Sequence, residues 1–441
     1  MILFLLFSAF AQRPDEGGFF AFSSADVLSY HDSVSFRVHY SVDGPNQTIL
    51  DDVDENGVPD FVEEVALTAE EVLNVYDNRG FRRPLTEADV GLELGGSPAF
   101  DFYLVDFGGS SDGMFGIDDC IDHRCAGYMV IENDFYGYGY SSISSAISTL
   151  VSHEFFHAVQ ASYRADQESW LSEGMAVWAE HLFEPEVRDY LFFCSEYLEH
   201  TERSLNRPPA GAINSFSYST ALWFGFLQEQ WGADIMISIL EELDTQEDSS
   251  QAMFDAIGEG FSDLWHEFGR WNLATSRRSG ILESYPYASQ LHGLKFVQEG
   301  ERILDDHRFY PLTSSYFQLE HVGGMMTFSI EEGAPEIVFS IHPTDGNIAL
   351  EPLESWEGEQ QRSWELEAGT YFLVGSFASP QSSSQKLEIC LGADCLFDEE
   401  QEEEEEIKSG CGGSQAYFFV GLIFLFQRRG RWPKKSIQSC G

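Results

Sequence analysis

The stretch LVSHEFFHAVQ, residues 150–160, places two histidines four residues apart, with a glutamate directly after the first. Residues four apart lie on one face of a helix, so His153 and His157 can both direct a ring nitrogen at one metal ion. Glu154 would lie on the flank of that site, where a carboxylate can take a proton from a metal-bound water. The stretch therefore predicts a zinc site with Glu154 as general base. The alternative is a chance run in an aromatic-rich core helix.

A third ligand is available in the next predicted helix. A catalytic zinc site needs three protein ligands and an open position for water. In ESWLSEGMAVWAE, residues 168–180, Glu173 lies three residues after Trp170 and directly before Gly174. We expect Glu173 to complete the zinc site.

The pairing of HEFFH with WLSEGMA resembles the gluzincin zinc metallopeptidases, the group that includes thermolysin and the alanyl aminopeptidases. The chain also resembles a family of secreted metallopeptidases described from myxobacteria, over roughly residues 30–280. The resemblance implies that His153, His157 and Glu173 bind zinc and that Glu154 is the base.

The oxyanion formed during peptide hydrolysis needs a donor besides the metal. Gluzincins commonly use a tyrosine or histidine from a later helix, and Tyr218 in SFSYSTALWFGFLQEQWG is the candidate in this chain. A core or capping tyrosine is the alternative. Glu180 and His181 can contact the metal ligands and orient them without binding the metal. Solvated or structural roles are the alternative.

These residues predict a zinc metallopeptidase, a hydrolase whose partners are peptide or protein substrates. Endopeptidase activity is the default, because no acidic exopeptidase motif is evident. The competing interpretation is a calcium-stabilised surface adhesin or binding protein with a structural zinc, although structural zinc needs no base beside its ligands. Cleavage specificity stays open, as does activation by removal of a segment after Gln12.

A second metal signal is DDVDENGVPDFVEE, residues 51–64. Oxygen-bearing residues at alternate positions, closed by a glutamate and with a glycine at the turn, match a calcium-binding loop. The expected calcium ligands are Asp52, Asp54, Asn56, Val58 through its carbonyl, Asp60 and Glu63. No helix is evident before the loop, so it is not a regular EF-hand. A solvated acidic turn is the alternative.

The charge balance restricts the partners. The chain has 441 residues, of which 74 are acidic and 24 are Lys or Arg, for a net charge of −50. Such a negative field repels the phosphates of nucleic acids and anionic lipid surfaces, so neither is an expected partner. The sequence carries no signal for the oligomeric state.

The expected fold class is α+β. Residues 12–290 would form the peptidase domain, β-rich to about residue 140 and helical to about residue 280. Residues 300–396 alternate like strands between Gly and Pro turns and predict a β-sandwich. Within it, LEAGTYFLVGS resembles the pre-peptidase C-terminal domains that accompany secreted peptidases. Helical periodicity lies in residues 144–163, 170–183, 186–200 and 219–231.

Both ends of the chain read as targeting segments. Residues 1–11 end in Ala-Phe-Ala and predict a signal peptide, with a buried first strand as the alternative. Residues 397–410 form an acidic spacer. Residues 411–441 join Cys-Gly, an apolar segment and an Arg-rich end, and resemble the MYXO-CTERM sorting tails, which implies processing or attachment at Cys411. We expect export to the bacterial cell surface or outside, with membrane contact, including outer-membrane anchoring, only through this tail. A plain C-terminal anchor is the alternative.

The cysteines suit an oxidising compartment. Cys120 and Cys125 have four residues between them, as do Cys390 and Cys395, and each pair can close a small disulfide loop. Cys194 lies in an apolar run, where a buried and inert thiol is expected.

Overall fold

The computed structural model describes residues 12–18, 20–186, 189–210, 215–279, 284–298, 307–330, 334–345, 348–349, 354–358, 361–379, 382–387 and 389–392. The predicted signal peptide, acidic spacer and sorting tail with Cys411 lie outside these residues. Among the described residues, no helix combines the length and apolar character that a membrane span requires.

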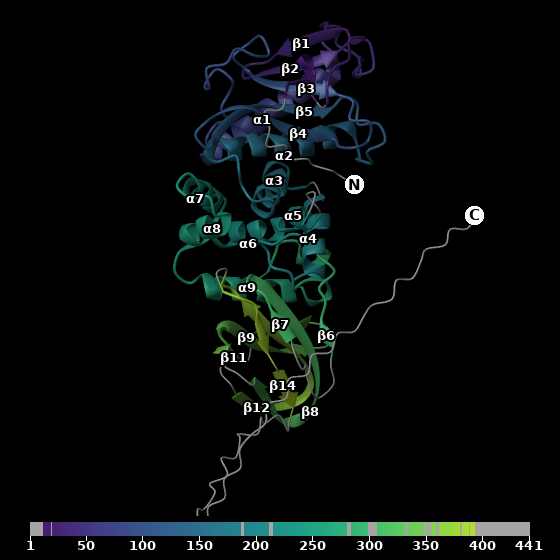
Figure 1. The fold of residues 1–441 in the computed structure, drawn as a ribbon. Coiled ribbons are helices and arrows are strands. Elements are labelled where there is room, and N and C mark those ends of the chain that lie inside the picture. The colour runs from purple at the N-terminus through teal and green to yellow at the C-terminus, as the bar shows by residue number, and fades with distance from the viewer. Residues whose placement is uncertain are drawn as a thin grey trace, which may run out of the picture. The chain divides into compact units, whose positions relative to one another are not determined.

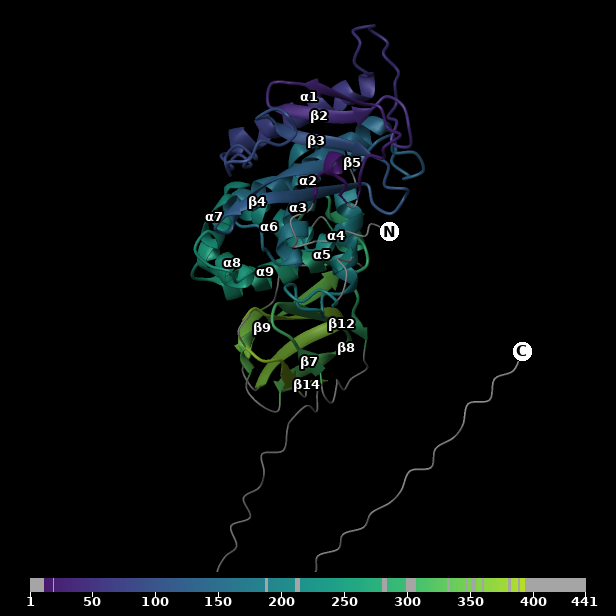
Figure 2. The same ribbon diagram turned by 45° about the horizontal axis from the view of Figure 1, so that its top comes forward.

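A five-stranded mixed sheet forms the first part of the chain, in the order β1-β2-β3-β5-β4. Its central pairs β2–β3 and β3–β5 are parallel, whereas the outer pairs β1–β2 and β4–β5 are antiparallel, which leaves β4 as an edge strand (Figure 2). The strands are β1 (Leu28–Asp32), β2 (Phe36–Ser41), β3 (Phe100–Val105), β4 (Gly113–Ile121) and β5 (Arg124–Glu132).

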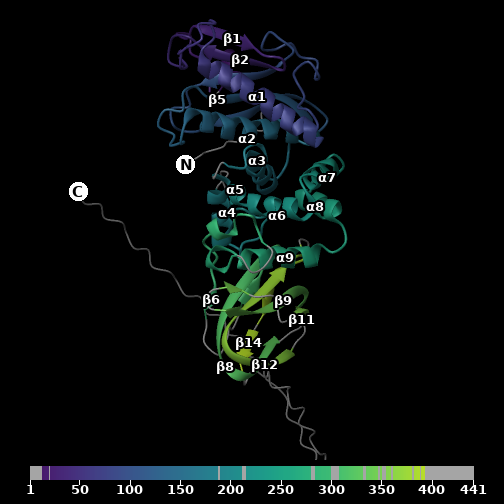
Figure 3. The same cartoon turned by 180° about the vertical axis from the view of Figure 1, so that it is seen from behind.

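Both faces of this sheet are covered. Helices α1 (Asp60–Arg79) and α2 (Ile143–Tyr163) pack on one face (Figure 3), against side chains such as Phe102. Phe20 and Phe22 of the N-terminal segment pack on the other face. Central strand β3 is accordingly buried along its whole length. The 20-residue helix α1 lies in a region for which the sequence analysis expected mainly strands.

On the face of the sheet that Phe20 and Phe22 cover, Arg13 is buried among carboxylates. Its guanidinium donates to Asp101 at 2.5 Å and to Asp118 at 2.6 Å, and it lies 3.5 Å from Glu87. Asp101 is on β3 and Asp118 is on β4, so Arg13 ties the N-terminal segment to both strands. Because a buried carboxylate needs a partner, this arginine offsets the cost of burying these acids.

Helix α3 (Ser169–Phe183) follows α2 and packs against it, and both helices are apolar around most of their surface, as buried helices must be. Gly174 lets α3 approach the next layer closely, because a Cβ there would lie 2.1 Å from the Thr220 hydroxyl. The remaining helices are α4 (Asp189–Glu199), α5 (Ser215–Ser219), α6 (Ala221–Trp231), α7 (Asp234–Leu243), α8 (Ser249–Ile257) and α9 (Phe261–Leu273).

The C-terminal part is built of strands. Its larger sheet has the order β10-β9-β12-β8-β14, with β11 paired to β9 and β6 paired to β8, and β7 and β13 form a second sheet. The strands are β6 (Val297–Gln298), β7 (His307–Phe309), β8 (Thr313–Ile330), β9 (Ala334–Asp345), β10 (Ile348–Ala349), β11 (Glu354–Gly358), β12 (Gln361–Phe377), β13 (Gln385–Leu387) and β14 (Ile389–Gly392).

Helix α9 lies against β8, β9 and β12 of this sheet (Figure 1). The Trp265 indole donates to the Thr313 carbonyl at 3.1 Å, and the Tyr316 hydroxyl donates to the Gly269 carbonyl at 2.9 Å. The fold class is therefore α+β, as the sequence predicts.

Candidate metal centre

Helices α2 and α3 bring the three predicted zinc ligands together. Nε2 of His153 lies 3.4 Å from Oε2 of Glu173, and Nε2 of His157 lies 3.5 Å from the same oxygen. One ligand atom from each residue falls within 4.8 Å of the other two. Two nitrogens and one carboxylate oxygen are donors that zinc commonly takes.

The other ring nitrogens of the histidines are held by neighbouring side chains. Nδ1 of His153 lies 2.5 Å from Oε1 of Glu180, and Nδ1 of His157 lies 2.8 Å from Oε1 of Gln160. The Gln160 amide donates in turn to the Ser172 carbonyl of α3 at 2.9 Å. These contacts fix both rings with Nε2 directed toward Glu173, an arrangement that protein metal sites commonly use to orient histidine ligands.

The charges of the three residues depend on one another. Burial opposes protonation of His153, but hydrogen bonds with Glu173 and Glu180 outweigh it and raise its pKa well above the ordinary value. Burial likewise opposes protonation of His157, whose pKa is raised by the charge of Glu173. Burial would raise the pKa of Glu173, yet the two imidazoles lower it to about 2. Glu173 is thus held as an anion, the form in which a carboxylate can bind a metal ion together with the two histidines.

Glu154 is fully buried beside these residues. Neither of its carboxylate oxygens has a hydrogen-bond partner among the described residues. Burial is the main cause that raises its pKa to about 7, and the charges of Glu173 and Asp112 add to the effect. A buried carboxylate without partners is costly unless a ligand or water completes it, so its position calls for a bound group.

Tyr218 lies on α5, with its ring centroid 5.9 Å from that of His153. The side chain is buried, and burial together with the charge of Glu173 raises the pKa of its phenol well above the ordinary value. The hydroxyl therefore keeps its proton at neutral pH and can act as a donor.

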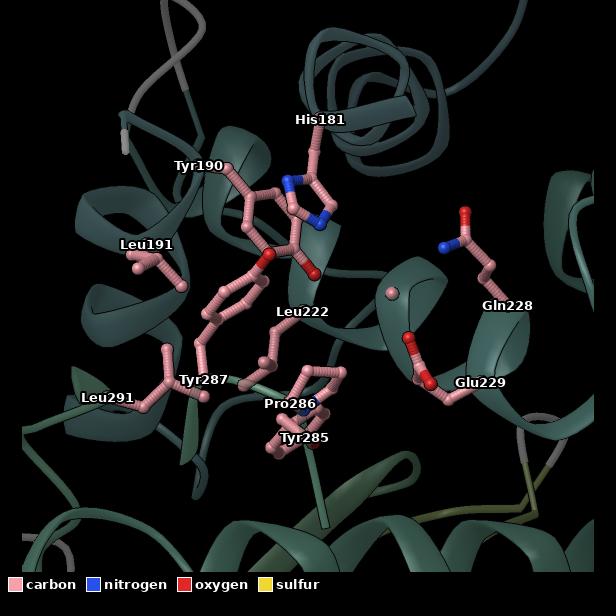
Figure 4. A pocket seen from close by; sticks show the side chains of 11 residues that line it. His181, Tyr190, Leu191, Leu222, Gln228, Glu229, Tyr285, Pro286, Tyr287 and Leu291 are labelled. Atoms are coloured by element: carbon pink, nitrogen blue, oxygen red, sulfur yellow. The ribbon is translucent and has the colours of Figure 1, made fainter. Parts of the chain in front are cut away.

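Glu180 and His181, the two residues predicted to contact the metal ligands, differ in their surroundings. Glu180 contacts His153, as described above. His181 instead stacks on Tyr190, with ring centroids 4.6 Å apart, and lines a pocket with Tyr287 and side chains of α6 (Figure 4). His181 also packs edge-on against Tyr287, with ring centroids 5.6 Å apart, so these contacts favour a packing role.

Asp112 is the residue of this centre that the sequence analysis missed. It directly precedes β4 and is buried, and its Oδ2 accepts a hydrogen bond from the Tyr140 hydroxyl at 2.7 Å. Its charge acts on His153, Glu154 and Tyr218. A single acidic residue before a strand is common in any sequence, so no local signal could have identified it.

The structure corrects the choice of edge strand. By analogy with gluzincins, the strand-like stretch GYMVIEND, residues 127–134, would be the edge strand along which a peptide lies. Most of it belongs to β5, which is paired on both sides, with β3 and with β4. The edge strand beside β5 is β4, whose Gly113 packs against Glu154.

The predicted calcium loop brings Asp52, Asp54 and Asp60 together, with one carboxylate oxygen of each within 4.8 Å of the others. The backbone amides of Asn56 and Gly57 donate to Asp52 at 3.1 and 2.9 Å. Gly57 has a φ of +91°, a backbone conformation that favours glycine at this turn.

The other predicted ligands lie in the same loop. The Asn56 side chain donates to Glu63 at 2.8 Å, and the Val58 amide donates to the Asn56 side chain at 2.8 Å. The carboxylates face one point on the surface just before α1, which suits a hard cation such as Ca²⁺.

The cysteines occupy three different settings. Cys120 and Cys125 form a disulfide across the β4–β5 hairpin, where they face each other in register. Cys194 is a buried free thiol, and burial raises its pKa, which makes it unreactive. Cys390 lies in β14, whereas Cys395 is outside the described residues, so their disulfide stays a prediction.

Comparisons with known proteins add little. No family model matches the sequence, and no curated protein is significantly similar. Among solved structures, the chain matches PliG of Aeromonas hydrophila, a periplasmic inhibitor of g-type lysozyme, at 17% identity over 21% of this chain and 87% of that chain, with a TM-score of 0.17. A likeness this low carries no argument about fold or function.

Proposed function

We propose that this protein is a zinc-dependent metallopeptidase with a gluzincin-type catalytic domain, which hydrolyses peptide bonds in peptides or proteins. The observation that carries the proposal is the convergence of His153, His157 and Glu173 beside the buried carboxylate of Glu154. Three ligands and a neighbouring base form the set that a catalytic zinc site requires.

The residues present fit a zinc ion. His153, His157 and Glu173 would hold it, with the histidine Nε2 atoms and Glu173 Oε2 as donors. When bound, zinc supplies Lewis acidity, which acidifies water and polarises a carbonyl oxygen. The raised pKa values of the metal-free histidines mean that protons compete with zinc for this site.

Glu154 would move the proton of the reaction. With a pKa near 7, its carboxylate can accept a proton from the attacking water and return it to the leaving amine. The new bond joins the water oxygen to the carbonyl carbon, and the bond that breaks is the peptide C–N bond. Tyr218 keeps its phenolic proton and can donate a hydrogen bond to the oxyanion.

The substrate would lie along β4. Among the described strands this strand pairs only with β5, so its other edge can accept an extended peptide as an added strand. Gly113 at the start of β4 lies next to Glu154, which would bring such a peptide to the proposed base. Endopeptidase action remains the default, because no acidic exopeptidase motif is evident in the sequence.

The remaining predictions accompany this proposal. We propose export, with the Cys120–Cys125 disulfide suiting an oxidising compartment, and surface attachment through the tail. We also propose that calcium binds at Asp52, Asp54 and Asp60, and that residues 300–396 form a domain of the pre-peptidase C-terminal type.

The adhesin interpretation, with a structural zinc, accounts less well for Glu154. A structural site has a closed shell of four ligands and gains nothing from a buried carboxylate without a partner beside it.

The test uses the purified full-length protein, loaded with zinc, beside its Glu154→Gln variant. Both are incubated with a proteome-derived peptide mixture, and new termini are read by mass spectrometry. We expect cleavage by the first and a rate lower by roughly 10³-fold for the second, since general acid–base catalysis contributes about 10²–10⁴-fold. Zinc content, measured in parallel, should be one per chain in both. Two inactive proteins that each hold one zinc would instead favour the adhesin.

A further inference from the structure

Asp112 is a buried carboxylate that the proposed hydrolysis does not use. Only 3% of the residue is exposed. Its Oδ2 accepts the hydrogen bond from Tyr140, whereas Oδ1 has no hydrogen-bond partner among the described residues. Leaving a buried carboxylate oxygen without a donor is costly, so this oxygen is suited to a donor that arrives with a ligand.

The backbone places Asp112 at the wall of the metal centre. The next residue, Gly113, packs so closely that a Cβ there would lie 2.9 Å from Cγ and 3.1 Å from Oε1 of Glu154. The charge of Asp112 acts on His153, Glu154 and Tyr218, which lie on two different helices of the centre. Asp112 thus lies where β4 begins and where a substrate on that strand would pass Glu154.

The charge of the centre favours a cation there. The charges of four buried carboxyl groups all act on the Tyr218 hydroxyl, those of Asp112, Glu154, Glu173 and Glu180. A divalent metal held by His153, His157 and Glu173 would leave this set with an excess of negative charge. An incoming group that is positively charged and carries N–H donors would satisfy both the free oxygen and the charge.

We propose that Asp112 binds a cationic group of the substrate, an ammonium or a guanidinium, and thereby sets the substrate preference of the metal centre. The inference rests on the proposed peptide hydrolysis at this site. Tyr140 holds the carboxylate by its Oδ2, and the substrate cation donates to Oδ1. The cation has two sources, the free amino terminus of the substrate or the side chain of a Lys or Arg residue near the scissile bond.

The experiment compares four versions of one peptide that the zinc-loaded full-length protein cleaves. The amino terminus is free or acetylated, and one position near the scissile bond is Lys or Met. The variant is Asp112→Asn, which keeps the shape and removes the charge. The matched control is Glu132→Gln on β5, which changes another buried carboxyl whose Oε2 already accepts from Tyr138 and from the Phe107 amide.

For the wild-type protein we expect kcat/KM to be about ten- to a hundred-fold higher for peptides that carry the cation, from hydrogen bonds to charged groups. Asp112→Asn should lose that preference, so that its kcat/KM is the same within about two-fold for peptides with and without the cation, whereas Glu132→Gln should keep the preference. The acetylated Lys peptide and the free-amine Met peptide show which source supplies the cation.

Three outcomes would overturn the inference: an equal loss for all four peptides, no preference in the wild-type protein, or loss of zinc from Asp112→Asn, which would make Asp112 a metal ligand. Binding of the same peptides to zinc-loaded Glu154→Gln, with and without Asp112→Asn, is measured by calorimetry. These binding affinities show whether Asp112 binds the cation even if no peptide is hydrolysed. Cation-dependent binding without hydrolysis would contradict the proposed function alone, and binding that ignores the cation would contradict the role of Asp112.

Discussion

Histidines are buried in two regions of this molecule, and their protonation moves in opposite directions. In the metal centre, the pKa values of His153 and His157 are raised. In the C-terminal strands and in the helix α9 that packs on them, burial lowers the pKa of His266 on α9 to about 3 and that of His307 on β7 to about 4. Desolvation acts against the charged imidazole at all four positions, so it does not explain the difference.

The neighbours explain the difference. His153 and His157 lie beside the carboxylates of Glu173 and Glu180, which stabilise a positive charge. The His266 ring instead contacts the hydroxyl of Ser340 at 2.9 Å. A hydroxyl carries no charge that could stabilise an imidazolium, whereas the carboxylates beside His153 and His157 favour a positive charge between them.

The largest effect is expected from removing the shared carboxylate. Glu173→Ala should lower the zinc content from one per chain to near zero and abolish hydrolysis, because two imidazoles alone do not make a zinc site. In the metal-free variant, the pKa values of His153 and His157 should fall, since burial then acts without the carboxylate that opposed it. Zinc content is measured by mass spectrometry of the metal, and the pKa values by NMR titration of the imidazoles.

Glu180→Gln serves as the matched control, because it removes a carboxylate that contacts the far nitrogen of His153 and lies outside the proposed ligand set. It should keep zinc, with an affinity lower by about 10- to 100-fold. Full zinc content in Glu173→Ala would show that the three residues are not the ligands.

The lowered pKa of His266 makes the free energy of unfolding depend on pH. His266 is neutral in the folded protein down to about pH 3, whereas in the unfolded chain its pKa is the ordinary 6.5. Below pH 6.5 the unfolded chain binds a proton at His266 that the folded protein does not bind. The free energy of unfolding therefore falls by about 1.4 kcal/mol per pH unit as the pH decreases from 6.5 toward 3, and above pH 6.5 it is unaffected by this group. Other charges near this ring are those of His342 on β9 and Arg270 on α9.

The measurement is urea unfolding of the wild type and of His266→Gln at about pH 7 and about pH 5. Glutamine keeps an N–H group for Ser340 but does not titrate, so the variant should lose roughly 2 kcal/mol less than the wild type over this interval. Equal losses would mean that His266 is not held neutral by the fold.

A smaller effect is expected at the calcium loop, where carboxylates gather without histidines. Asp52 and Asp54 lie at the surface, so calcium binding should raise the melting temperature by roughly 3–10 °C through mass action. Asp54→Asn should remove most of this rise. Glu55→Gln is the control, because Glu55 lies in the same loop outside the predicted ligand set. A rise that is equal in both variants would place the calcium elsewhere.

The helices at the metal centre form almost where the sequence predicts them. The helices expected at residues 144–163 and 170–183 form at Ile143–Tyr163 and Ser169–Phe183. Long apolar runs with few charges specify buried helices whatever surrounds them. Helix α1 also had a readable signal, since Val62, Val65, Ala66, Ala69, Val72 and Leu73 recur at helical spacing and are buried.

The sequence by itself determined which residues share a turn: the spacing of His153 and His157 on one helix face, the disulfide loop from Cys120 to Cys125, and the acidic turn before α1. Only the tertiary structure decided that β4 is an edge strand, that Asp112 is buried beside a glycine that packs against Glu154, and that Arg13 is buried against Asp101 of β3. Helical spacing and short loops are properties of adjacent residues. Strand order and the pairing of buried charges join residues that are far apart in the sequence, such as Arg13 and Asp118, which are 105 positions apart, and they are chosen by the packing of the whole sheet.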